Sequence, residues 1–151
     1  MQIKDIMTPQ PRTASPRTTL AEAAQLLWNG DCGILPVTDE GKLVGVVTDR
    51  DMYIALGTRN QPASDIAVGD VASATVWTCA PTDDVHVALD TMRERRVRRL
   101  PVVADGSLVG IVSLNDLALV AGAGKPVRNE EVVDTFKAIC AHRPLPAAVA
   151  A

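Results

Sequence analysis

Residues 34–51 read ILPVTDEGKLVGVVTDRD and residues 99–116 read RLPVVADGSLVGIVSLND, so one pattern occurs twice in the chain. The two copies stay in register without a gap from about residue 3 to residue 52, always 65 positions apart. The same offset pairs Asp5 with Asp70, Thr13 with Thr78 and Pro16 with Pro81. A register of this length predicts two copies of one structural unit.

The residues of each copy predict the same order of elements. A short β-prone stretch at 13–14, or 78–79, precedes apolar positions spaced i, i+3, i+4, i+7, which form one face of a helix. Two short apolar strands follow, joined by a turn at 39–41 or 104–106, in which Gly supplies a positive φ. A second helix begins near Asp49 and Leu114. The order is therefore βαββα.

One such unit offers only a small sheet with an exposed face, which is too little to be stable alone. We therefore predict an α/β (α+β) fold with the two units packed sheet to sheet. The expected division is residues 1–57 for the first copy, 58–64 for a connector, 65–120 for the second copy, and 121–151 for a loop, a C-terminal helix and a disordered tail. Asn129 is the expected cap of that helix, with an apolar stripe from Val132 to Cys140.

The composition narrows the class of protein. The chain has 151 residues and a net charge of −3, which argues against nucleic-acid binding by bulk charge. The three cysteines are scattered, with neither disulfide nor zinc spacing, so no metal site is expected. Neither a secretory signal nor a membrane-spanning apolar run is evident, so we expect a cytoplasmic protein without a membrane partner.

The doubled Leu-Pro-Val, turn, Leu-Val-Gly-(Val/Ile)-Val-(Thr/Ser)-x-x-Asp pattern closely resembles the CBS domain, named after cystathionine β-synthase. The resemblance covers almost all of residues 1–120, and Lys4-Asp5-Ile6-Met7-Thr8 is similar to the start of bacterial members. It implies a Bateman module, a pseudo-two-fold pair of CBS repeats that commonly forms a homodimer. Such pairs bind adenosine-containing ligands in clefts between the repeats, and here no further cofactor is expected.

The resemblance implies that Thr48 and Asp51 of the first copy, and Ser113 and Asp116 of the second, bind the ligand. In the family, the carboxylate accepts hydrogen bonds from the ribose hydroxyls, and the start of a helix offers free N–H groups to an anion. An alternative is that each hydroxyl only caps the second helix, with Asp reaching back to it. The two roles are compatible.

The remaining candidate site residues also come from the resemblance. Thr13 and Thr78 match positions beside the ligand base, although a strand in the core is an equally good interpretation. A basic residue before the Leu-Pro-Val strand contacts phosphate in some members, which nominates Arg98 or Arg99 for the second copy. The first copy has Gly33 and Ile34 there, and Arg50 could compensate. The sequence thus predicts two clefts with unequal ligand preferences.

The leading hypothesis is a non-catalytic sensor that binds AMP, ADP, ATP or S-adenosylmethionine and regulates an unknown protein in trans or through its own dimer. A second hypothesis is a dimerisation module without a ligand. A third is nucleic-acid binding through the arginines between Arg93 and Arg99, against which the acidic total and the scarcity of aromatic residues count. An enzyme is not expected, because the sequence shows no nucleophile–base pair, paired acids or metal ligands.

Overall fold

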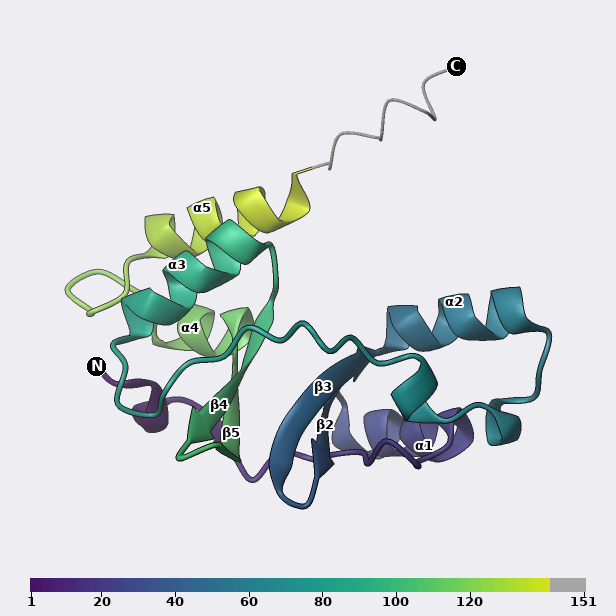
Figure 1. Cartoon of the computed structure of the whole chain (residues 1–151). Helices are drawn as coiled ribbons and strands as arrows, with labels where there is room; N and C mark the ends of the chain where they lie inside the picture. Colours follow the sequence, from purple (N-terminus) through teal and green to yellow (C-terminus); the bar gives the residue numbers. More distant parts are fainter. Residues whose placement is uncertain (142–151) are drawn as a thin grey trace.

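A computed structural model describes residues 1–141, the range to which every structural statement below refers (Figure 1). Each repeat is a helix, a β-hairpin and a second helix. The first repeat comprises α1 (Leu20–Gly30), β2 (Ile34–Asp39), β3 (Lys42–Thr48) and α2 (Asp49–Arg59). The second comprises α3 (Val85–Arg95), β4 (Arg99–Ala104), β5 (Ser107–Ser113) and α4 (Leu114–Val120). Short elements precede and separate them: η1 (Ile3–Asp5), β1 (Thr8–Pro9), η2 (Ala63–Asp65) and η3 (Val68–Asp70).

The two hairpins have the same register. Pro36 faces Val46 in the first, and Pro101 faces Ile111 in the second, each with an irregularity one residue further on. Both turns use two consecutive residues with positive φ, 48° and 80° at Glu40-Gly41 and 49° and 77° at Asp105-Gly106. Two positive φ values give the tight hairpin turn whose twist matches that of the strands. The predicted turns and strands are confirmed.

The predicted first strand of each unit is reduced to a single parallel bridge. Ala14 pairs with Val37, and Cys79 pairs with Val102 at the equivalent position. In each case the backbone N–H donates to the carbonyl of a proline, over 3.0 Å in the first copy and 3.2 Å in the second. The order βαββα therefore holds, although its first β element is one residue long.

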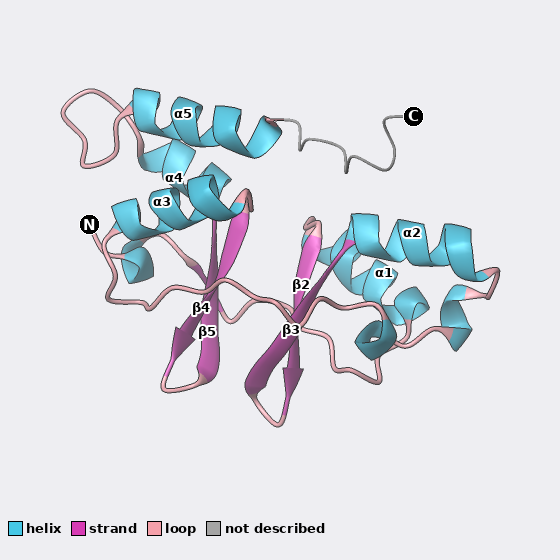
Figure 2. Cartoon of the chain, turned by 45° about the horizontal axis from the view of Figure 1, so that its top comes forward, coloured by secondary structure: helices cyan, strands magenta, loops and turns pink. Residues whose placement is uncertain are grey.

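The segment before each repeat packs on the other repeat. β1 pairs with β5 of the second repeat, and Ser73, in the connecting segment, pairs with Val46 of the first. Figure 2 shows the two hairpins side by side. They adjoin at Lys42 and Ser107, and this pairing unites the strands in one five-stranded sheet. Ile3 is fully buried in the core of the second repeat, whereas Ile66 is buried in that of the first. The repeats are thus interlocked.

The C-terminal helix α5 (Asn129–Cys140) lies against α3 and α4 of the second repeat (Figure 1). Asn129 is its first residue and not its cap as predicted; instead, Glu131 reaches back to accept from the N–H of Arg128 over 2.8 Å. Only Thr135 is buried, while Phe136 remains 50% exposed. The predicted apolar stripe therefore packs only in part. The predicted disordered tail, residues 147–151, lies outside the described range.

Within residues 1–141, no helix is both long and apolar enough to cross a bilayer.

Candidate functional site

The start of the second helix in each repeat is a closed capping box. The N–H of Asp51 donates to Thr48 Oγ1 over 3.2 Å, while Asp51 Oδ2 accepts from the Thr48 N–H over 2.9 Å and from its hydroxyl over 2.7 Å. Ser113 and Asp116 repeat these bonds at 3.3, 2.7 and 2.6 Å. The capping role considered for these residues is therefore real. In both boxes the bonds to the carboxylate use Oδ2, so Oδ1 remains available to another donor.

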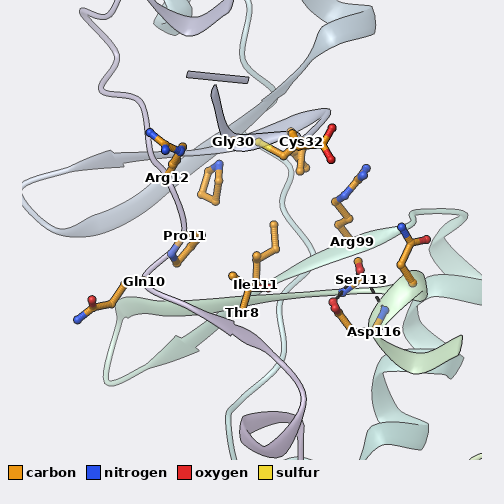
Figure 3. Close-up of a pocket in the computed structure, with 14 residues that line it drawn as sticks. Thr8, Gln10, Pro11, Arg12, Gly30, Cys32, Arg99, Ile111, Ser113 and Asp116 are labelled. Carbon is orange, nitrogen blue, oxygen red and sulfur yellow. Dashed lines mark hydrogen bonds between the residues drawn. The ribbon is translucent and has the colours of Figure 1, made fainter. Parts of the chain in front are cut away.

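Each capping box lies beside a cleft between the repeats. The first, here called the Asp116 cleft, has a volume of about 420 Å³. Figure 3 shows Ser113 and Asp116 on one side of it, Arg12 and Cys32 on the opposite side, and Arg99 between Cys32 and Ser113. Arg12 can lie close to the end of α1 because Gly30 has no side chain: a Cβ there would be 2.9 Å from Arg12 Cδ.

The second cleft, here called the Thr48 cleft, has a volume of about 850 Å³. Thr48 and the start of α2 form one side, and the residues between α3 and β4 form another. The last turn of α5 adds Ile139 and Cys140, for which the Asp116 cleft has no equivalent. Trp77 lines this cleft as well, with the Arg95 guanidinium 4.0 Å from its ring centroid in a cation–π contact.

The two clefts are copies of one another in the repeat register. Eleven of their lining positions correspond at an offset of 65, among them Gln10 with Thr75, Arg12 with Trp77, Asp31 with Arg96, Cys32 with Val97 and Asn115 with Arg50. Ile34 and Arg99, which correspond to each other, line both clefts. The clefts therefore share a boundary at the pseudo-two-fold axis but differ in the side chains that face them.

The charge of the two clefts differs strongly. The Thr48 cleft is lined by one acidic residue, Asp49, and by four arginines: Arg50, Arg96, Arg98 and Arg99. Among the described residues, none of the four forms a salt bridge. The Asp116 cleft has Arg12 and Arg99 against Asp31 and Asp116. The Thr48 cleft is therefore the one whose field attracts an anion.

The structure places the predicted arginines differently from the expectation. The sequence assigns Arg98 and Arg99 to the cleft of their own repeat. In the structure, Arg98 lines the Thr48 cleft and not the Asp116 cleft, whereas Arg99 lines both. The reason is that the first residue of β4, Arg99, lies at the boundary shared by the two clefts, and the residues just before it line the cleft of the first repeat. Arg50 lines the Thr48 cleft, as the compensation argument required. The two clefts do differ in charge, but the excess of arginines lies in the Thr48 cleft of the first repeat and not in the cleft of the second repeat.

Three of the other predicted site residues do not line the cleft expected for them. Thr13 and Thr78 are exposed and are absent from the lining of both clefts. Asp51 is half-buried and reaches the Thr48 cleft only through its bonds to Thr48. Arg12 and Trp77 were missed, although each lies one residue before a nominated threonine. The sequence did offer a signal: the two positions are equivalent in the repeat register, yet one carries Arg and the other Trp.

The three thiols occupy distinct environments. Cys32 lines the Asp116 cleft, Cys140 lines the Thr48 cleft, and Cys79 is buried in the second core. Burial, with a smaller contribution from nearby Asp83, raises the pKa of Cys79 to about 12. Each cleft thus carries a single accessible thiol, and the third thiol is protected from the solvent.

We expect iodoacetamide at pH 8 to alkylate Cys32 and Cys140 while Cys79 reacts more than a hundred times more slowly, because thiolate is the reacting form and its fraction falls tenfold per unit of pKa. Peptide mass spectrometry over a time course measures the three rates. Unfolding the protein in guanidinium chloride should make the rates equal. If Cys79 of the native protein were labelled as fast as Cys140, the buried environment described for Cys79 would be wrong.

Comparison with known proteins agrees with the doubled architecture. The family model described as "CBS domain" matches residues 3–57 and 68–122. The CBS domain-containing protein YhcV of Bacillus subtilis is 41% identical over 118 residues, which span 78% of this chain and 83% of that protein.

Two solved structures share the arrangement. The CBS domain pair of protein MJ0100, in complex with 5-methylthioadenosine and S-adenosyl-L-methionine, is 30% identical with a TM-score of 0.71, covering 79% of this chain and 94% of that one. Hypoxic Response Protein I, with two coordinated zinc ions, is 31% identical with a TM-score of 0.73, covering 79% and 98%. In residues 1–141 of this chain, no three His, Cys, Asp or Glu side chains converge as metal ligands. By its matched repeats and its fold, the chain belongs to the CBS domain family as a tandem CBS pair.

Proposed function

We propose that this CBS pair is a regulatory sensor that binds an adenosine-containing ligand, with the ligand's phosphate groups in the Thr48 cleft. The observation that carries the proposal is a set of arginines that line one cleft and form no salt bridge within residues 1–141: Arg50, Arg96, Arg98 and Arg99. Guanidinium groups match phosphate oxygens in geometry and charge. A cleft of about 850 Å³ is within the range of small-molecule sites.

The capping boxes support a second contact with the ligand. Since Asp116 lines its cleft and accepts the bonds of the cap through Oδ2, its Oδ1 can accept from the vicinal hydroxyls of a ribose without opening the helix start. In the Thr48 cleft the group of the capping box that faces the ligand is Thr48, and Asp51 holds it in place. The MJ0100 pair was solved with two adenosine derivatives, which makes the same ligand class reasonable here. In this proposal the Asp116 cleft, with a balanced charge, favours a nucleoside or a less anionic ligand.

Regulation of another molecule requires a surface that a partner can contact. Tyr53 and Ile54 on α2 are 79% and 52% exposed, and α2 continues directly from the cap of the Thr48 cleft. We propose that occupancy of this cleft is transmitted along α2 to a second copy or to a regulated protein. An exposed apolar face of this kind is typical of an interaction site.

The test is isothermal titration of ATP, AMP, S-adenosylmethionine and adenosine into the protein and into its Arg98→Ala variant. We expect ATP affinity to fall about tenfold in the variant, the order of one charge-assisted hydrogen bond, while adenosine affinity stays within twofold. Arg93→Ala is the matched control, because Arg93 lies on α3 a short distance before Arg98 in the chain, lines neither cleft and pairs with Asp90. Absence of binding by all four compounds at millimolar concentration, or equal losses in both variants, would overturn the proposal.

A further inference from the structure

The two clefts share one guanidinium. Arg99 lines both, from its place at the start of β4, and Figure 3 shows its side chain between Cys32 and Ser113 in the Asp116 cleft. Its counterpart at the pseudo-two-fold axis is Ile34, which also lines both clefts but carries no charge. The axis therefore passes between one arginine and one isoleucine, so the structure supplies one cation where symmetry would supply two.

The clefts depend on this cation to different degrees. The Thr48 cleft retains Arg50, Arg96 and Arg98 when Arg99 is discounted. The Asp116 cleft retains only Arg12 among its cationic lining residues, together with two carboxylates, Asp31 and Asp116. An anionic group in the Asp116 cleft therefore needs Arg99 far more than one in the Thr48 cleft does.

We infer that the two clefts compete for Arg99, so that a phosphate-bearing ligand in the Thr48 cleft weakens the binding of a second such ligand in the Asp116 cleft. The inference rests on the proposed function and adds a regulatory property to it. A guanidinium that donates to one phosphate cannot present the same fork to another, and the loss of one charge-assisted contact lowers affinity about tenfold. Because linkage is reciprocal, a ligand in the Asp116 cleft weakens the Thr48 cleft by the same factor. An uncharged adenosine produces no such coupling.

The thiols provide a separate reporter for each cleft. In a Cys140→Ser protein, the slow alkylation of buried Cys79 leaves Cys32 to report occupancy of the Asp116 cleft; a Cys32→Ser protein leaves Cys140 to report the Thr48 cleft. The experiment measures how much ATP protects each thiol from iodoacetamide. Protection midpoints then give the ATP affinity of each cleft within one chain.

The decisive variant is Arg50→Ala with Arg98→Ala, which weakens the Thr48 cleft and leaves Arg99 in place. We expect the ATP midpoint at Cys32 to fall about tenfold, so that losing two arginines improves binding at the other cleft. Adding Arg99→Ala should abolish this improvement. Arg17→Ala with Arg93→Ala is the charge-matched control, since both residues lie outside the clefts, and it should leave the midpoint unchanged.

Three results would overturn the inference while leaving the proposed function intact. The first is an unchanged or higher Cys32 midpoint in the double variant. The second is an improvement that persists after Arg99→Ala, which would indicate plain repulsion between two bound anions. The third is an equal improvement with adenosine in place of ATP. If ATP, AMP, S-adenosylmethionine and adenosine all failed to protect either thiol, the proposed function itself would be refuted.

Completing the symmetry provides a complementary test. Ile34→Arg places a second guanidinium at the shared boundary, so each cleft gains its own. We expect the ATP midpoints at Cys32 and Cys140 to become independent, with that at Cys32 falling about tenfold. Ile34→Met is the control for the change in side-chain shape and should preserve the coupling. Coupling that survives in Ile34→Arg contradicts competition for a single cation.

Discussion

Ile3→Ala is expected to destabilise the second repeat by about 2–5 kcal/mol, although in the sequence Ile3 precedes α1, the first helix of the first repeat. The side chain is fully buried with Leu100 and Met92 in the core of the second repeat. Two hydrogen bonds of 2.9 Å, from the N–H groups of Ile3 and Lys4, hold the segment to residues 81–83. Removing the side chain leaves a cavity in a core that these bonds keep from closing.

Ile66→Ala is the matched control, because Ile66 is 1% exposed in the core of the first repeat. Hydrogen exchange followed by mass spectrometry locates each loss. In Ile3→Ala we expect the amides of β4 and β5 to lose protection first, and in Ile66→Ala those of β2 and β3. If Ile3→Ala exposed β2 and β3 first, the interlocked arrangement would be wrong.

Gly45→Ala and Gly57→Ala are expected to change stability in opposite directions. A Cβ on Gly45 would lie 2.9 Å from the carbonyl oxygen of Ser73, closer than real Cβ contacts allow. Ser73 exchanges two backbone hydrogen bonds with Val46, of 2.9 and 3.0 Å, so the oxygen cannot move without weakening them. We expect a loss of about 1–3 kcal/mol, typical of overpacking in a buried site.

Gly57 provides the contrast within the same repeat. It lies inside α2, and a Cβ there meets nothing within 4 Å. Alanine should therefore stabilise the helix by about 0.5–1 kcal/mol, since glycine loses more backbone entropy on folding. Urea denaturation of both variants gives the two free energies of unfolding. Equal effects from the two substitutions would show that Ser73 does not pack on β3 as described.

Most of the local structure could be predicted because the cause of each element lies within a few residues. The turns at Gly41 and Gly106 need positive φ, which glycine adopts without strain. The caps at Thr48 and Ser113 need a hydroxyl and a carboxylate three residues apart. Asn129 shows the limit of such rules. It resembles a cap, yet Arg128 is the cap residue, Glu131 accepts from its N–H, and the helix begins at Asn129, one residue earlier than predicted.

The candidate site could be predicted only in part. The capping pairs were found because each lies within one repeat and recurs in the other. The assignment of Arg98 to the cleft of its own repeat was wrong, because the order of residues along the chain does not determine which cleft the residues before β4 line. Arg12 and Trp77 were missed for a similar reason: their roles depend on which segment approaches them from the other repeat.

The sequence by itself determined that this protein is two copies of one βαββα unit, with a hydroxyl–carboxylate pair at the same point in each. That result followed from the unbroken register of the repeat and from interactions between residues close in sequence, and both can be recognised without the tertiary structure. Only the tertiary structure decided that each leading segment packs on the opposite repeat, that four arginines meet at Thr48, and that Arg99 is shared by two clefts. These depend on burial and on approach across the pseudo-two-fold axis, which brings together residues more than 30 positions apart.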